Sequence, residues 1–600
     1  MTGIDIAIIV AYFLITIGAG IFFSRKSATS IQSYFLGDNQ SKWWMLAASG
    51  SASNYSIAGT IWFISILIVL GMKSWWLVLV WWLPGAVFLM SYSGIWIRRT
   101  GVLTAAELNK IRFGTDRGAK WGRTAFSVMI LLFSVASLGT SYIAIHKFAQ
   151  IFGLAGHATA ITVMALTSLY VLVGGFRGVI LTDFLQTILL FAISLIVGVV
   201  CYMNYTGAEL YAGIAEVGVS SDYWKSPSFD AKPNLGVFSE GAYSNWGDLL
   251  RAMAAFSVVG FLGCIGGAGG RYGEQRFLAT RTVKEAGWMA GLWIVLAVPR
   301  WLVIAGIAFI ALTMFGPVVV AGADPDAALP LFLKSNLLGS GIKGLVIVGF
   351  VAAYMSTFSS EVNASASIIV RDLYQPLTRS EGDTGAGHML PSYLATAALS
   401  TISITLGYLF VEQSNLNGIC SWMMSGLISC IVVPLALRWF WGRMNGWGFT
   451  VGCLIGLLPS FMMLLKTLWP ELPVLDQISN DVLTYAILLS SLAGCVIGSL
   501  VTAPIDETEI DEFYCRVRPF GLWGAVERRV QAAGKPMASK LSFGRAALNS
   551  LIGCAGMVAM YMVPAFVMGH WYVDAAVVAL IALVCCIALY FTWFKALPDD

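Results

Sequence analysis

Two carboxylic acids lie inside long apolar stretches of this sequence, where a charged side chain is costly. Asp183 belongs to an apolar run at 178–203, and Glu361 belongs to another at 340–370. Acids inside a membrane usually have a function, because their burial in lipid is expensive. An exit path for a cation would suit both acids. A structural pairing with an arginine or with backbone groups is the alternative.

A single arginine interrupts a third apolar run. Arg300 follows Pro299 in the middle of the run at 285–314. Its guanidinium could bind a substrate carboxylate through two parallel hydrogen bonds. It could equally extend toward the membrane surface, or pair with an internal acid such as Glu361. The sequence leaves these three roles open.

Two short stretches rich in small residues suggest interrupted helices. The run from Ser49 to Thr60 has nine small residues among twelve, and the run from Gly263 to Gly273 has six glycines among eleven. A helix is broken inside a membrane only where its backbone is buried in protein or lines a cavity. Transporters built from inverted repeats place such breaks where substrate and ions bind. Close helix packing through small residues is the alternative for either run alone.

The composition identifies the environment in which these residues act. Among 600 residues, 58% are hydrophobic and only 11% are charged, and the mean hydropathy is +0.78. Soluble proteins have about 25% charged residues, so a soluble enzyme is excluded, and so is a disordered chain. The net charge of +4 does not suggest a nucleic-acid partner. The ten cysteines form no CxxC pair, which argues against a disulfide framework or a zinc site.

The apolar runs are long enough to cross a bilayer, which needs about 20 residues per helix. They predict about fifteen transmembrane helices, at 3–23, 43–71, 75–97, 122–148, 156–174, 178–203, 246–269, 285–314, 340–370, 389–411, 417–437, 446–466, 483–503, 545–567 and 571–595. Arg25 and Lys26 follow the first run and nothing basic precedes it, so we expect no signal peptide and an external N-terminus. Most Lys and Arg residues then fall on the inner side, and the C-terminus is cytoplasmic.

The two small-residue runs divide the helices into two blocks of five, and since five is odd, the second block has inverted topology. The loop at 504–544 places Trp523 beside several arginines, which predicts a short helix on the inner membrane face; a solvated loop is the alternative. The predicted divisions are 1–42 (N-terminal helix and inner loop), 43–203 (first repeat), 204–245 (external loop), 246–440 (second repeat), 441–503 (two peripheral helices), 504–544 (cytoplasmic loop) and 545–600 (two C-terminal helices).

Four motifs give a resemblance to a known family. The stretch Gly174-Gly175-Phe-Arg177 followed by Thr182-Asp183-Phe-Leu-Gln186 resembles a turn and helix of the sodium/solute symporter family. Further similar stretches run from Tyr34 through Asn54, from Gln275-Arg276 through Ala286, and from Ala352 through Pro376, so that the resemblance spans about residues 1–500 in order. Gly178 departs from it, since the family usually has Ala or Ser there. The resemblance implies an all-α, leucine-transporter-like five-plus-five inverted-repeat fold, with one helix before it and about four after it.

The resemblance also implies a sodium site. Sodium is a hard cation that prefers oxygen ligands, and the family's site combines carbonyls of its first core helix with a carbonyl and two hydroxyls of its eighth. Carried over by position, the ligands are the carbonyls of Ala52, Tyr55 and Ala353 and the hydroxyls of Ser356 and Thr357. All five groups are neutral, which favours sodium over a proton as the coupling ion.

The substrate should bind beside this site, between the two breaks. The candidate residues are Asn54, Trp62, Gly263, Gly266 and, as an open question, Arg300. Several positions that are polar in the family's sugar carriers are small or apolar here, for example Gly59 and Ala297, which weakens a galactose-like pocket. Trp62, Trp75 and Trp76 flank the expected entrance, and aromatic faces stack well on sugars. The leading hypothesis is therefore sodium symport of a sugar-like solute, with a carboxylate or an amino acid as the alternative.

Other function classes have weaker support. A solute sensor built on a transporter core would need a signalling module, and only a short tail follows the last predicted helix. A membrane enzyme would need catalytic residues, and the four histidines are expected to lie singly. We therefore expect no enzyme activity, no cofactor other than sodium as the coupling ion, and lipid, solute and sodium as partners. A bacterial inner membrane is the expected location.

Overall fold

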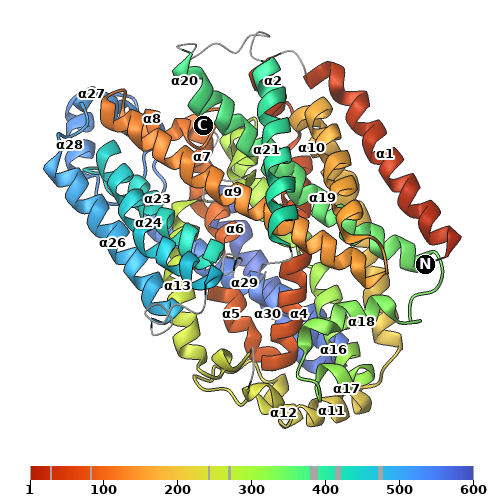
Figure 1. Cartoon of the computed structure of the whole chain (residues 1–600). Coiled ribbons are helices and arrows are strands. Elements are labelled where there is room, and N and C mark those ends of the chain that lie inside the picture. Colours follow the sequence, from red (N-terminus) through yellow and green to blue (C-terminus); the bar gives the residue numbers. More distant parts are fainter. Residues whose placement is uncertain are drawn as a thin grey trace.

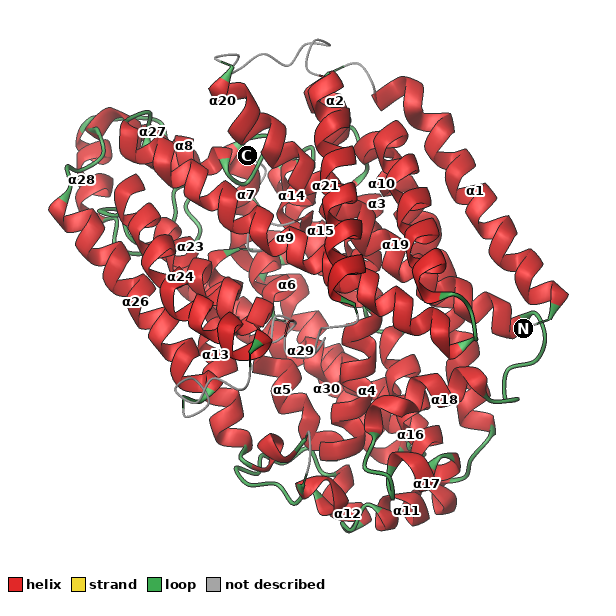
Figure 2. Cartoon of the chain, viewed as in Figure 1, coloured by secondary structure: helices red, strands yellow, loops and turns green. Residues whose placement is uncertain are grey.

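The computed structural model describes residues 2–27, 30–80, 84–240, 243–267, 272–378, 389–411, 419, 422–469 and 478–598. These residues form a bundle of helices, and the part of the chain described in Figure 2 contains no strand. In Figure 1, α27 and α28 lie at one end of the bundle, and α11, α12 and α17 lie at the opposite end. We call these the α27 end and the α11 end. The all-helical fold predicted from hydropathy is confirmed.

The long helices that build the bundle are α1 (Gly3–Ser27), α9 (Arg117–Ile151), α10 (Gly156–Met203), α13 (Leu249–Gly266), α15 (Val283–Leu296), α16 (Arg300–Met314), α19 (Ile342–Ile368), α21 (Met389–Phe410), α23 (Ile428–Phe440), α24 (Gly446–Leu468), α26 (Asn480–Val501), α29 (Phe543–Met568) and α30 (Tyr572–Thr592).

Shorter helices connect or extend them, namely α2 (Ile31–Leu36), α3 (Trp43–Ser53), α4 (Ile57–Leu70), α5 (Trp75–Val80), α6 (Gly85–Phe88), α7 (Gly94–Thr100), α8 (Glu107–Phe113), α11 (Gly207–Glu216), α12 (Ser221–Lys225), α14 (Tyr272–Leu278), α17 (Gly316–Val319), α18 (Ala328–Lys334), α20 (Gln375–Leu377), α27 (Glu507–Val517) and α28 (Gly524–Ala532).

Thirteen helical stretches of the described chain are long and apolar enough to cross a membrane. Fifteen runs were predicted, and the difference comes from two stretches that each contain two of them. Ile57–Thr100 spans 44 residues and Gly156–Met203 spans 48, whereas one crossing needs about 20. Inside α10, Gly175 has a φ of +52°, a left-handed conformation that suits glycine. An added Cβ there would lie 2.9 Å from the carbonyl oxygen of Tyr34, so the residue must also be small.

The first predicted break is present in the structure. α3 ends at Ser53 and α4 begins at Ile57, so Asn54, Tyr55 and Ser56 lie outside both helices. The Ser56 side chain caps α4 by accepting a bond from the amide of Gly59 at 3.3 Å. The second predicted break falls between α13, which ends at Gly266, and α14. Residues 268–271 of that run lie outside the described part of the chain.

Two ion pairs, one of them buried, join helices close to the α27 end. The Arg123 guanidinium on α9 donates to Asp372 at 2.7 Å, and the hydroxyl of Thr104 donates to the same carboxylate at 2.7 Å. Arg371 pairs with Glu107 on α8 at 2.9 Å. Arg371 and Asp372 lie in the π-helical segment Ile369–Tyr374 that continues α19. These bonds therefore fix the end of α19 against α8 and α9. α19 is the helix that carries Ser356 and Thr357, whose hydroxyls are predicted to bind sodium.

The predicted membrane-surface segment at 504–544 is packed against protein. It forms α27 and α28, and Trp523 is only 2% exposed. Its indole donates to the carbonyl of Trp439 at 2.8 Å, and the Arg112 guanidinium lies 4.7 Å from its ring. The segment is therefore helical, as predicted, and its Trp523 side chain contacts protein. Aromatic residues beside arginines suit a membrane surface, but they suit a protein groove containing a buried arginine equally well.

Candidate functional site

The break in the first core helix lies against α19. The Thr357 hydroxyl on α19 donates to the carbonyl of Ser53, the last residue of α3, at 2.8 Å, and it lies 3.1 Å from the carbonyl of Ala353. Ala52, Tyr55 and Ala353 belong to one small buried cluster. A helix that stops inside the protein leaves carbonyls without helical partners. The fold therefore gathers carbonyls and hydroxyls in the region where the sequence predicts a sodium site.

The Ser356 side chain extends from this region to a buried carboxylate. Its hydroxyl donates to Asp183 Oδ1 at 2.6 Å, and its oxygen lies 3.3 Å from the hydroxyl of Ser53. Asp183, Ser356 and Ser53 are all fully buried. The five predicted ligand residues and Asp183 are thus neighbours, contributed by α3 and its break, α19 and α10.

Asp183 is paired with an arginine from the helix that follows the second break. Arg276 on α14 approaches Asp183 Oδ2 to 3.1 Å, and the two side chains are 1% and 0% exposed. The hydroxyls of Ser49 and Ser360 also donate to this oxygen, at 2.5 and 3.4 Å. The same guanidinium nitrogen of Arg276 lies 2.6 Å from the Ser53 hydroxyl and 2.7 Å from that of Ser360. This network is the arginine pairing that the sequence left open as an alternative.

Glu361 lies on the same helix as Ser356 but contacts a different neighbour. The hydroxyl of Ser134 on α9 donates to Glu361 Oε1 at 2.5 Å, and Ser365 donates to Ser134 at 2.8 Å. The two predicted exit-path acids therefore lie against different helices. Asp183 contacts α3 and α14, whereas Glu361 contacts α9.

The predicted substrate residues lie at varied depths. The Asn54 side chain is exposed, and its oxygen accepts a bond from the hydroxyl of Tyr272 at 3.3 Å. Trp62 is half-buried and packs edge-on against Trp246, with ring centroids 6.2 Å apart. Gly263 and Gly266 are buried on α13.

Gly266 has a packing role in this structure. Its carbonyl accepts a bond from the indole of Trp439 at 2.9 Å, and an added Cβ would lie 3.2 Å from the side chain of Leu435. Both neighbours belong to α23. The glycine lets α13 approach α23 closely where α13 ends.

Arg300 binds the break itself. Its Nη1 donates to the carbonyl of Asn54 at 3.0 Å, and its Nη2 donates to the carbonyl of Ser56 at 3.2 Å and to the Thr60 hydroxyl at 3.0 Å. The guanidinium also lies 5.0 Å from the centre of the Tyr55 ring. The partners in these contacts are two backbone carbonyls and a hydroxyl, not an internal acid such as Glu361.

A small cavity of about 10 Å³ adjoins the break. A volume of this order accommodates about one water molecule, and so a single ion, but no sugar. Its lining comes from α3, the break, α10, α15 and the start of α16, namely Ser51, Ala52, Tyr55, Thr187, Leu190, Phe191, Ser194, Leu296, Pro299 and Arg300.

Comparison with known proteins identifies the family. Residues 34–456 match the sodium:solute symporter family. The chain belongs to this family. It is accordingly an integral, multi-pass membrane transporter, a symporter that uses sodium as its coupling ion, and not an enzyme.

Relatives of the symporter carry several solutes. Sodium/glucose cotransporter 4 of Danio rerio is 25% identical, over 84% of this chain and 80% of its own length. The high-affinity proline transporter PutP of Bacillus subtilis is also 25% identical, over 62% of this chain and 78% of its own. The solved structure of a Na+-coupled sialic acid symporter in a substrate-bound outward-open state superposes with a TM-score of 0.62 at 18% identity, covering 84% of this chain and 99% of that one. That likeness shows a shared leucine-transporter-like fold.

Sequence reasoning about this symporter missed two residues of the site. Arg276 is the partner of Asp183, and Tyr272 bonds both the Ser53 carbonyl and Asn54 at 3.3 Å. The Gln275-Arg276 pair was recognised only as part of a motif. The signal that could have identified Arg276 was an arginine shortly after the glycine-rich break, in a chain whose Asp183 lies in an apolar run and needs a positively charged partner.

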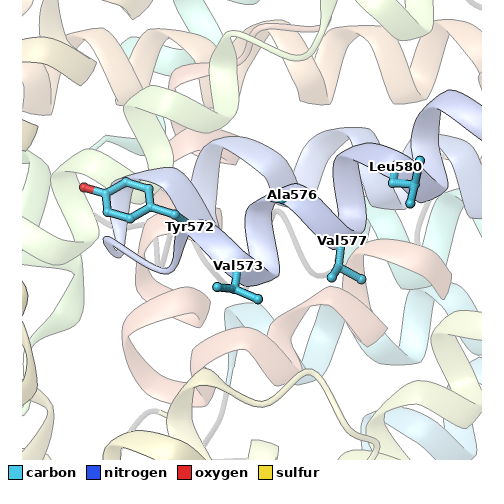
Figure 3. Close-up of a pocket in the computed structure, with 5 residues that line it drawn as sticks. All are labelled: Tyr572, Val573, Ala576, Val577 and Leu580. Atoms are coloured by element: carbon cyan, nitrogen blue, oxygen red, sulfur yellow. The ribbon is translucent and has the colours of Figure 1, made fainter.

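Another surface of the symporter carries a different kind of hollow. Figure 3 shows the side chains of Tyr572, Val573, Val577 and Leu580 on α30, which line it together with Ala576. Apart from the Tyr572 hydroxyl, these side chains are apolar, and Val573 is 77% exposed. A binding site for a polar solute needs convergent polar groups. This hollow lacks such groups and therefore does not fit a polar solute.

Proposed function

We propose that the symporter binds sodium at the break through the carbonyls of Ala52, Tyr55 and Ala353 and the hydroxyls of Ser356 and Thr357. One observation carries the proposal: the Thr357 hydroxyl lies within 3.1 Å of both the last carbonyl of α3 and the Ala353 carbonyl. A hydroxyl that donates here can rotate and offer a lone pair to a cation. All five ligands are neutral, so protonation cannot replace the ion by titrating one of them.

We also propose that the ion leaves past Asp183 and Glu361. Asp183 is hydrogen-bonded to Ser356, one of the proposed ligands. While Arg276 neutralises Asp183, that carboxylate has little attraction for a departing cation. Movement of α14 would withdraw Arg276 and expose the acid. Release would then be tied to the movement of the helix that follows the second break, as alternating access requires.

The transported solute is proposed to be a neutral, sugar-like compound. The supporting observations are the aromatic pair Trp62 and Trp246 beside the break, and the two terminal nitrogens of Arg300, which already bind backbone carbonyls. A guanidinium held in this way is poorly placed to bind a substrate carboxylate. Asn54, whose side chain is exposed at the break, and Trp62 are the proposed contacts, with Gly263 and Gly266 bordering the site. The cotransporters for glucose among the relatives are consistent with this choice, and those for proline represent the alternative.

Orientation and organisation complete the proposal. The α27 end is the cytoplasmic side of a bacterial inner membrane, because most Lys and Arg residues of the loops fall there. The N-terminus is then external, and residues 43–203 and 246–440 are the two inverted repeats. These assignments follow from charge distribution and from the positions of the two breaks.

Uptake into proteoliposomes tests the function. Purified symporter would be supplied with labelled glucose, galactose, proline and a sialic acid, each with an inward sodium gradient, with a potassium gradient of equal size and with a pH gradient. We expect sodium-driven uptake of a sugar. Sodium-driven uptake of proline or sialic acid alone would replace the sugar by the alternative class. Equal uptake with potassium or with a pH gradient would contradict the sodium site.

A further inference from the structure

We infer that Arg300 is a positioning residue of the sodium site: it holds the three residues of the break, and so fixes the direction of the Tyr55 carbonyl. The inference rests on the proposed function, because it takes the Tyr55 carbonyl as a sodium ligand. It gives Arg300 no contact with sodium or with the solute.

The contacts of Arg300 bracket this carbonyl. Nη1 binds the carbonyl of Asn54 and Nη2 binds the carbonyl of Ser56, the residues on either side of Tyr55. The guanidinium lies 5.0 Å from the centre of the Tyr55 ring, within the range of a cation–π contact. All three residues of the break are therefore held by one side chain. With its neighbours and its ring fixed, Tyr55 has little freedom to rotate its peptide group.

The chemistry of the break explains why a guanidinium is suited to this task. The end of a helix presents carbonyls that lack helical partners and carries a partial negative charge. Within a membrane protein such groups need an internal partner. Arginine offers a rigid, planar set of donors, and here two of its nitrogens reach two separate carbonyls. A lysine carries the charge on a single nitrogen and lacks this fork.

The surroundings of Arg300 are built to keep it in place. The Thr60 hydroxyl, which is fully buried, lies 3.0 Å from Nη2 and also donates to the Ser56 carbonyl at 2.8 Å. A Cβ added at Gly59 would lie 3.3 Å from Nη2, so glycine leaves the room that the guanidinium occupies. Pro299 directly precedes Arg300 and occupies the N-cap position of α16. The side chain therefore projects from a fixed helix start toward the break.

These contacts distinguish a positioning role from a substrate role. Bidentate recognition of a carboxylate requires two nitrogens on one edge of the guanidinium. Both terminal nitrogens of Arg300 already bind carbonyls. Arg300 and the Ala52 and Tyr55 side of the proposed ion site also border the same small cavity. A change at Arg300 should therefore weaken sodium binding more than it weakens solute binding.

Two measurements on full-length variants test the inference. The first is the half-saturating sodium concentration for stabilising the purified symporter against heat, without solute. The second is the solute KM for uptake at saturating sodium. We expect Arg300→Gln to raise the sodium constant about tenfold, since it removes charged hydrogen bonds, and to raise the solute KM by a smaller factor through Asn54. Arg300→Lys should lie between the wild type and the glutamine variant.

A milder variant covers the case in which Arg300→Gln does not fold. Thr60→Val keeps the shape of the side chain and removes one bond to Nη2, and should raise the sodium constant about threefold. Thr313→Val is its control, because that hydroxyl belongs to the opposite end of α16 and bonds the carbonyls of Phe309 and Ile310. It should leave the sodium constant unchanged.

The outcomes separate this inference from the proposed function. A raised solute KM with an unchanged sodium constant would make Arg300 a solute ligand and overturn the inference. An unchanged sodium constant in Thr60→Val, or equal damage from Lys and Gln at position 300, would also overturn it. If the wild-type protein itself shows no sodium-dependent stabilisation or uptake, the proposed sodium site fails instead.

Discussion

The two halves of the broken first core helix are held by opposite kinds of contact. α3 is held by a fully buried ion pair, in which Arg276 joins Asp183 and the hydroxyls of Ser49 and Ser53. α4 is held from the α11 end by Asp326, whose half-exposed carboxylate accepts bonds from Ser65 and Tyr243, each at 2.5 Å. Separating a buried ion pair is expensive, whereas hydroxyls can leave a hydrated acid at little cost.

This difference indicates which side of the transporter requires more free energy to open. Opening at α4 separates neutral hydroxyls from an acid that water already reaches. Opening at α3 leaves Asp183 and Arg276 without partners, unless water or a cation enters with the movement. The free energy needed to open the α3 side would therefore be supplied only when sodium and solute are bound. Such a barrier would prevent either of them from crossing the membrane without the other.

The largest effect is expected from breaking the α3 contact. Arg276→Gln leaves the Asp183 carboxylate buried without its cation, and removing one partner of such a pair costs about 3–5 kcal/mol. We expect a large loss of thermal stability in detergent. The double variant Asp183→Asn with Arg276→Gln should recover much of it, because no unpaired charge remains.

An exposed pair provides the control for this prediction. Arg251 and Asp481 are 2.9 Å apart with side chains 60% and 35% exposed, so Arg251→Gln should cost less than about 1 kcal/mol. Equal losses from Arg251→Gln and Arg276→Gln would show that the buried pair has no special weight in the stability of the protein.

The second prediction concerns the hydroxyl that links α19 to the end of α3. Thr357→Ala removes a proposed sodium ligand and should raise the half-saturating sodium concentration for uptake about tenfold, while folding stays intact. Ser403→Ala is a matched control, since its buried hydroxyl bonds the carbonyl of Leu399 within α21. Unchanged sodium dependence in Thr357→Ala would refute the ligand assignment.

The third prediction concerns the α4 contact. Asp326→Asn removes the negative charge that two hydroxyls bind and should destabilise the closed arrangement at the α11 end by about 1 kcal/mol. A cysteine introduced by Trp62→Cys, placed beside the break, should then react faster with an impermeant thiol reagent added from outside. Sodium dependence of uptake should be unaffected. Unchanged labelling would mean that Asp326 does not keep this side closed.

Hydropathy and small-residue runs predicted the helices and the first break, because both depend on local sequence. The partners of the buried charges were not predictable in the same way. Arg276 and Asp183 are 93 residues apart, and Ser65 and Asp326 are 261 apart, so only the packing of whole helices brings them together. His146 and His157 were expected to lie singly, yet their ring centroids are 4.4 Å apart, because the chain turns between α9 and α10. The inverted-repeat boundaries remain a prediction.

The smallest effect is expected far from the break, in the segment that packs at the α27 end. Burial disfavours the charged form of Asp511, but hydrogen bonds from Arg529 at 2.6 Å and Lys535 at 3.0 Å outweigh it and hold the pKa of this carboxyl below its ordinary value. A depressed pKa stabilises the fold above the ordinary pKa of aspartate, which is about 3.9. That contribution is lost as the pH falls through the lower pKa of the folded state.

Arg529→Gln tests this last prediction. The Arg529 side chain is 32% exposed, so solvent screens the pair and the loss at neutral pH should be below about 1 kcal/mol. The difference in thermal stability between Arg529→Gln and the wild type should be constant from pH 7 to about pH 5 and should shrink as Asp511 is protonated. A difference that grows on acidification would contradict the sign of the shift. Because α27 and α28 lie far along the chain from the break, the half-saturating sodium concentration of Arg529→Gln should equal that of the wild type. That result would show that the contacts of Asp511 stabilise the fold without affecting the contact between α3 and α19.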